Sequence, residues 1–154
     1  MSNPLEELAR KLKTPGRQAA LNDILAQTLA RFDSQTGTIH LLDGEKQTLH
    51  LAAHIGLPPA MLDVVRLIPA GKGIAGQVVA RNAPVTICNL QMDAGGLARP
   101  GAKQTGVGGA LCVPIRTGGK IAGALGVGAV RQREYTAAET HALGEIAALI
   151  GSNL

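Results

Sequence analysis

Residues 67–90 read LIPAGKGIAGQVVARNAPVTICNL and contain four different local patterns in succession. A short extended entry comes first, and a glycine-rich turn, a short helix and a β-type run follow it. We expect the rest of the chain to form a sheet and helices around this segment. Any ligand pocket should lie here as well.

The glycines of this segment have the spacing G-x-G-x-x-G, at Gly71, Gly73 and Gly76. In a βαβ unit that spacing places a helix N-terminus under a dinucleotide pyrophosphate. Here Pro69 interrupts the entry, and the Asn-Ala-Pro run at residues 82–84 ends the helix after about two turns, too short for a crossover helix. We therefore interpret Gly71 and Gly73 as a chain turn. Ala75 and Gly76 would let the helix lie close to a sheet.

Four short motifs occur in a fixed order: IPAGKGIAG at residues 68–76, NAPV at residues 82–85, GALCVPI at residues 109–115 and GGKIAGALGV at residues 118–127. In this order they resemble the GAF domain family, from about Ala20 to the C-terminus. The resemblance implies an α+β fold of GAF or PAS type with a central antiparallel β-sheet. N- and C-terminal helices would cover one face, and a short helix and a long loop the other. It also implies that the two terminal helices build a homodimer.

The remaining patterns divide the chain into a helical extension at residues 1–16 and a GAF-like domain at residues 17–154. A capping box, Thr136-x-x-Glu139, predicts the start of the final helix. Turn residues between alternating runs predict two β-hairpins. The expected elements are a helix over 17–31, strands over 36–43, 47–54, 110–116 and 120–130, and a short helix over 60–65.

Composition limits the class of protein. The chain has 154 residues, which is enough for one domain without disulfides, so Cys88 and Cys112 are expected to be buried thiols in a reducing compartment. There is no apolar run of 18 residues and no N-terminal signal segment, so we expect a cytoplasmic protein with no membrane partner. The net charge of +4 is spread along the chain and only Phe32 and Tyr135 are aromatic, which argues against a nucleic-acid partner.

Three histidines, His40, His50 and His54, fall on the first predicted hairpin. His50 and His54 share one strand face, and His40 could lie across from either. No cysteine or carboxylate cluster accompanies them, so we interpret them as ordinary strand residues and predict no metal site. Haem ligation by His50 or His54 would need large aromatic walls that the chain lacks. The sequence identifies no cofactor.

The expected pocket lies between the sheet and two segments, residues 71–81 and 89–109. Backbone amides at the glycine turn would donate to a polar or anionic small molecule, and a cation from the long glycine-rich loop would close above it. The predicted ligand-binding residues are Leu41, Ile68, Gly73, Ile74, Ile87, Asn89, Arg99, Lys103, Gly108 and Leu111.

We expect a non-catalytic sensory or regulatory domain, in which ligand binding orders the long loop and shifts the terminal helices. Two alternatives stay open. The first is an enzyme like the GAF-type free methionine sulfoxide reductases, with its thiols supplied by Cys88 and Cys112, although Ala75 stands where the resemblance would place a cysteine. The second is a ligand-free scaffold that only dimerises or docks to a partner.

Overall fold

A computed structural model describes residues 4–87, 108–131 and 133–154. Its centre is a six-stranded antiparallel sheet with the strand order β3-β2-β1-β6-β5-β4. Both predicted hairpins, β1–β2 and β5–β6, are confirmed, and each reverses the chain direction between neighbouring strands. The strands are β1 (Thr36–Asp43), β2 (Thr48–Ile55), β3 (Leu67–Pro69), β4 (Val85–Ile87), β5 (Gly109–Thr117) and β6 (Lys120–Ala129).

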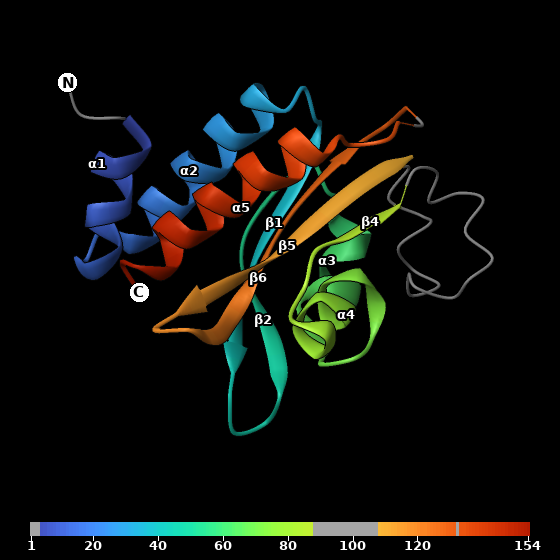
Figure 1. The fold of residues 1–154 in the computed structure, drawn as a ribbon. Helices are drawn as coiled ribbons and strands as arrows, with labels where there is room; N and C mark the ends of the chain where they lie inside the picture. The colour runs from blue at the N-terminus through green and yellow to red at the C-terminus, as the bar shows by residue number, and fades with distance from the viewer. Residues whose placement is uncertain (1–3, 88–107, 132) are drawn as a thin grey trace.

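The helices form a layer on each face of this sheet (Figure 1). One layer contains α1 (Pro4–Arg10), the 3-10 turn η1 (Lys11–Lys13), α2 (Arg17–Arg31) and α5 (Ala137–Gly151). The other contains α3 (Pro59–Val65) and α4 (Gly73–Arg81). The α+β arrangement implied by the resemblance is confirmed, and most of the predicted long loop lies outside the described residues.

Strand β6 carries side chains of very different size on its two faces. Leu125 and Val127 belong to the core cluster under α2 and α5. Ala124 belongs to the second cluster, on the α4 side. Gly126 and Gly128 share the face of Ala124, because side chains alternate along a strand with a period of two. The helix layer of α2 and α5 therefore packs on the branched side chains of β6. The α4 layer packs on the other face of β6, where the side chains are small or absent.

The C-terminal end of α5 lies directly on the backbone of β5. A Cβ atom at Gly151, the last residue of the helix, would overlap the carbonyl oxygen of Arg116. On the same strand, the Thr117 hydroxyl donates to the carbonyl oxygen of Gly151 at 2.9 Å. The missing side chain sets how closely the helix can approach the sheet at this point.

The predicted capping box at the start of α5 is confirmed. Thr136 Oγ1 accepts from the backbone N–H of Glu139 at 3.1 Å, and Glu139 Oε1 accepts from the backbone N–H of Thr136 at 2.9 Å. The other carboxylate oxygen of Glu139 accepts from Arg133 at 2.5 Å. Burial alone would raise the pKa of Glu139, but the Thr136 hydrogen bond and the Arg133 ion pair outweigh it and lower the pKa.

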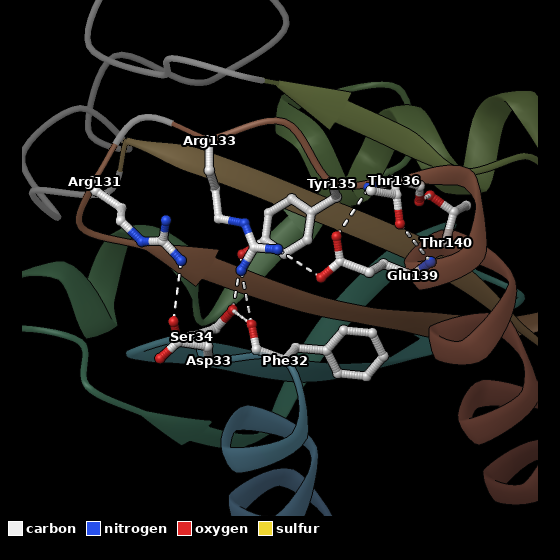
Figure 2. A network of polar contacts seen from close by, with 9 residues as sticks. All are labelled: Phe32, Asp33, Ser34, Arg131, Arg133, Tyr135, Thr136, Glu139 and Thr140. Carbon is white, nitrogen blue, oxygen red and sulfur yellow. Dashed lines mark hydrogen bonds and ion pairs between the residues drawn. The ribbon is translucent and has the colours of Figure 1, made fainter.

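Arg133 also links α5 to the turn between α2 and β1 (Figure 2). Its Nη1 donates to the carbonyl oxygen of Phe32 at 2.8 Å, and its Cζ lies 4.1 Å from the centroid of the Tyr135 ring. The Tyr135 hydroxyl lies 2.8 Å from Ser34 Oγ. Residues 32–34 and 133–139, two segments distant in sequence, are thereby held together at one end of the sheet.

Large apolar side chains are rare on the described surface. Leu67 and Val130 are the exposed ones among the described residues, and neither belongs to α1, α2 or α5. Dimerisation through the terminal helices therefore stays a prediction. Within the described ranges, no helix combines the length and the apolar character needed to cross a lipid bilayer.

Two glycines of α5 allow a matched test of the packing at its C-terminal end. We expect Gly151→Ala to lower the free energy of unfolding by about 1–3 kcal/mol, because the added methyl forces the helix away from Arg116. Gly144→Ala should instead raise it by about 0.5–1 kcal/mol, because its Cβ would meet open space and alanine favours the helix. Urea unfolding of the three proteins measures both changes. Equal effects of the two substitutions would contradict the close contact at Gly151.

Candidate functional site

A cavity of about 140 Å³ lies between the sheet and the layer of α3 and α4. Its floor comes from the faces of β1, β6 and β5 that carry small or polar side chains. Its walls come from the segment 57–75, which contains α3, β3 and the first turn of α4. The lining residues are Thr36, Gly37, Thr38, His40, Leu57, Val64, Val65, Ile68, Gly73, Ile74, Ala75, Ala110, Leu111, Cys112, Gly126, Val127 and Gly128.

Gly126 lies in the middle of this floor. A Cβ atom there would come 3.3 Å from Thr38 Oγ1, which is closer than an ordinary van der Waals contact, and 3.5 Å from Cys112 Sγ, which is an ordinary one. Its neighbours across the sheet are Thr38 on β1 and Cys112 on β5. Any side chain at position 126 would therefore occupy part of the cavity.

The glycine turn positions the opposite wall. Gly71 and Gly73 have φ values of 86° and 66°, so the predicted turn at these glycines is confirmed. A Cβ at Gly76 would lie only 2.6 Å from the carbonyl oxygen of Pro69, which confirms the predicted close approach of the helix to the sheet. The backbone that it approaches is that of β3 and of the glycine turn. The helix then ends at Arg81, and its C-cap Asn82 has a left-handed φ of 51°. Gly73 and Ile74 are thereby held against the cavity.

His40 is the most deeply buried polar group that lines the cavity, with 2% of its surface exposed. Its Nε2 lies 2.8 Å from the carbonyl oxygen of Val65. Since a carbonyl can only accept, Nε2 carries the proton and Nδ1 is left as an acceptor. Burial lowers the pKa of His40, and the Val65 hydrogen bond acts weakly in the opposite direction. The ring is therefore neutral at pH 7.

The Nδ1 atom of His40 is buried and has no hydrogen-bond partner. In the part of the chain that the structure describes, it is the single buried side-chain nitrogen or oxygen in this condition. Buried polar atoms in native proteins are almost always paired. His40 Nδ1 is thus an exception to this rule, on a residue that lines the cavity.

Cys112 is a free thiol on the floor of the cavity. Burial raises the pKa of its thiol to about 12, against a smaller lowering by a backbone hydrogen bond at Val113. The thiolate is the reactive form of cysteine, so a protonated Cys112 is a poor nucleophile.

Charged groups are missing from the described lining, which contains no Asp, Glu, Lys or Arg. Among the described residues, no group of three His, Cys, Asp or Glu side chains could hold a metal ion. His50 and His54 are exposed on β2, where they pair with Leu41 and Thr38 of β1. A bulge between these two pairs puts the histidines on opposite faces of the sheet, so the prediction that they share one face is wrong. The arrangement is suited to holding a neutral molecule by shape and by few hydrogen bonds.

The predicted ligand-binding residues have different places in this structure. Ile68, Gly73, Ile74 and Leu111 line the cavity. Leu41 packs on the opposite face of the sheet, against the core cluster under α2 and α5. Ile87 and Gly108 are buried near the end of a strand and do not line the cavity. Asn89, Arg99 and Lys103 lie outside the described residues. Cys88, the proposed thiol of the reductase alternative, also lies outside them.

The sequence-based prediction missed the floor of the cavity. Thr36, Thr38 and His40 stand at every second position of β1, and Gly126 and Gly128 do so on β6. A period of two places each set on one face. This alternation predicts a face of small and polar residues, whereas the expected pocket has large apolar walls.

A family model described as GAF domain matches residues 17–154. No curated protein matches the sequence significantly.

Several solved structures share the fold. A free methionine-R-sulfoxide reductase from Neisseria meningitidis, in complex with its substrate, has a TM-score of 0.78 and 19% identity, over 97% of this chain and 83% of that one. The GAF domain of a phosphoenolpyruvate-protein phosphotransferase from Coxiella burnetii has a TM-score of 0.78 and 18% identity, over 97% and 89%. The corresponding Acinetobacter domain has 0.74 and 21%, over 98% and 92%. At these identities the likeness concerns the fold.

The lowered pKa of His40 predicts how stability depends on pH. The unfolded imidazole, with an ordinary pKa near 6.5, takes up a proton as the pH falls, whereas the folded ring stays neutral. The unfolded state then binds more protons, so the free energy of unfolding decreases below pH 6.5, by at most about 1.4 kcal/mol per pH unit. Urea unfolding between pH 7.5 and 5.5 measures this slope. A His40→Phe variant with the same slope as the parent would contradict the assignment.

The raised pKa of Cys112 predicts slow alkylation of the folded protein. At pH 8.5 a thiol with a pKa of about 12 is almost entirely protonated, whereas an unfolded thiol is about half ionised. In a Cys88→Ser background, iodoacetamide should therefore react with the native protein on the order of a thousandfold more slowly than with the urea-unfolded protein. Mass spectrometry of quenched samples gives both rates. Comparable rates would show an accessible, ionised thiol.

Proposed function

Because the chain belongs to the GAF domain family, we propose that it is a regulatory domain that binds a small molecule in the cavity between the sheet and α4. The cavity itself carries this proposal. An apolar cavity of about 150 Å³ is large enough to hold benzene, and the one described here is close to that size, at about 140 Å³. The ligand is then a compact molecule rather than a nucleotide or a haem.

The chemistry of the described lining supports binding rather than turnover. Cys112 is held as a thiol by its raised pKa, His40 is neutral, and the described lining offers no carboxylate or cation. The expectation of an anionic ligand depended on Arg99 and Lys103, which lie outside the described residues. We therefore propose a neutral ligand for the part of the cavity described here.

Regulation would begin at the walls. Gly73 and Ile74 belong to the first turn of α4, and Val64 and Val65 to the end of α3, so a bound molecule touches both helices of this layer. Binding that favours one arrangement of these helices shifts their equilibrium by the difference in affinity. A readout through the long loop and a dimer of the terminal helices is our prediction from the sequence.

Toluene provides a direct test of the proposed binding site. At ten times its Kd, a ligand that binds only the folded state stabilises it by about 1.4 kcal/mol, which raises Tm by about 3–5 °C for a chain of this size. We expect toluene to raise the Tm of the native protein by this amount. Gly126→Ala places a methyl group on the cavity floor and should reduce the shift by half or more.

Gly144→Ala is the matched control, because it is the same substitution in a part of α5 where a Cβ meets open space. This variant should keep the full toluene shift. A native protein that shows no shift with toluene would overturn the proposal. An equal shift in the Gly126→Ala variant would place the binding elsewhere.

A further inference from the structure

We infer that Thr38 orients the ligand of this cavity. The ligand is then a neutral, mostly apolar molecule about the size of benzene with one polar group, which forms a hydrogen bond with Thr38 Oγ1. This inference rests on the proposed function and specifies the chemistry of its ligand. It follows from the direction of the Thr38 side chain, from its missing partner and from the character of the remaining lining.

The hydroxyl group of Thr38 lies on the floor of the cavity. Thr38 belongs to β1, which lies between β2 and β6 in the sheet. Its neighbour Ile39 packs in the core cluster under α2 and α5, so the side chain of Thr38 points to the opposite face, toward α4. On that face Thr38 Oγ1 is the atom nearest to the Cβ position of Gly126, at 3.3 Å. The oxygen atom therefore borders the space above Gly126.

The same hydroxyl group is accessible and has no partner. Among the described residues, Thr38 Oγ1 makes no hydrogen bond. The unpaired side-chain oxygens and nitrogens that are fully buried in the described part of the chain are limited to His40 Nδ1. Because Thr38 Oγ1 is also unpaired, it has to be accessible, and Thr38 itself is only partly buried. The side of the sheet to which it points is the cavity.

An accessible hydroxyl group at this position selects its ligand. A ligand that covers Thr38 Oγ1 removes it from water, and leaving the hydroxyl unpaired would cost affinity. A hydroxyl group can donate and accept, so a ligand hydroxyl, amine or carbonyl group would satisfy it. A site of this kind discriminates against an analogue that lacks the polar group.

The other polar side chains of the described lining are less suited to this role. Thr36 Oγ1 already donates to a backbone carbonyl oxygen of β6 at 3.3 Å, and His40 Nε2 pairs with one at the end of α3. Both residues are buried. The thiol of Cys112 is only a weak hydrogen-bonding group. The hydroxyl of Thr38 is therefore the group that can anchor a ligand.

The rest of the lining determines the remainder of the molecule. Ile68, Ile74 and Val64 contribute hydrocarbon walls. No charged side chain among the described lining residues would compensate a charge on the ligand, and burying an uncompensated charge is very costly. A neutral apolar body with one polar group at the Thr38 end matches these features.

Phenol and toluene form a matched pair of probes, because phenol has a hydroxyl group where toluene has a methyl group. We expect the phenol-to-toluene affinity ratio to fall by about threefold to tenfold in Thr38→Val, which keeps the branched side chain but has no hydroxyl. Dividing by the toluene affinity removes the effects of ring size and cavity access. Thr38→Ser restores the hydroxyl and should restore the ratio of the native protein. Calorimetric titration gives the affinities.

Thr48→Val is the matched control, because it is the same substitution at a residue of β2 that does not line the cavity. Thr48 Oγ1 donates to the carbonyl oxygen of Lys46 at 3.1 Å, in the turn of the first hairpin. The affinity ratio of this variant should equal that of the native protein.

A crystal structure of the native protein with phenol supplies a readout that needs no variant. The phenol oxygen should lie at about 2.8 Å from Thr38 Oγ1. Should Thr38→Val fail to fold, this structure decides alone.

The outcomes separate the two proposals. If toluene binds while the ratio is unchanged in Thr38→Val, or falls equally in Thr48→Val, the cavity binds ligands but Thr38 does not orient them. A phenol oxygen that points away from Thr38 leads to the same conclusion. If neither probe binds the native protein, the proposed function fails and this inference fails with it.

Discussion

Strand β6, near the centre of the sheet, has large side chains on one face and small ones on the other, and the rest of the structure depends on that difference. On β6, Leu125 and Val127 support the layer of α2 and α5, while Ala124, Gly126 and Gly128 face α4. Interiors pack to nearly constant density, so a floor without side chains has to be filled from above or remain open. Here α3 and α4 cover the floor only partly, and a cavity remains.

The two layers have different physical roles. On the α2 and α5 side, Gly151 brings the helix against β5, and the Arg133 network ties the start of α5 to the turn before β1. That side is cross-linked at both ends of α5, so it serves as a support for the sheet. On the α4 side, short elements joined by glycine turns surround a cavity that the buried His40 lines. A ligand would complete the packing of this second layer, which gives it a means of changing the domain.

The parts that could be predicted from the sequence depend on local signals. The turn at Gly71 and Gly73 and the cap at Thr136 are fixed by residues close together in the chain, and both are confirmed. The place of Leu41 could not be predicted in that way. A period of two shows that Leu41 and His40 face opposite sides, but β1 is buried on both sides, so its own sequence does not determine which side holds the cavity. That depends on helices packed from elsewhere in the chain.

The central claim is that the small residues of β6 leave real space on the α4 side of the sheet. Diffraction from a crystal of the native protein under xenon pressure tests it most directly, because xenon enters apolar cavities of this size. The account predicts a xenon peak in van der Waals contact with Gly126, Cys112 and Ile74, and a weakened peak in Gly126→Ala. A native crystal in which side chains fill this volume and no xenon binds would contradict it.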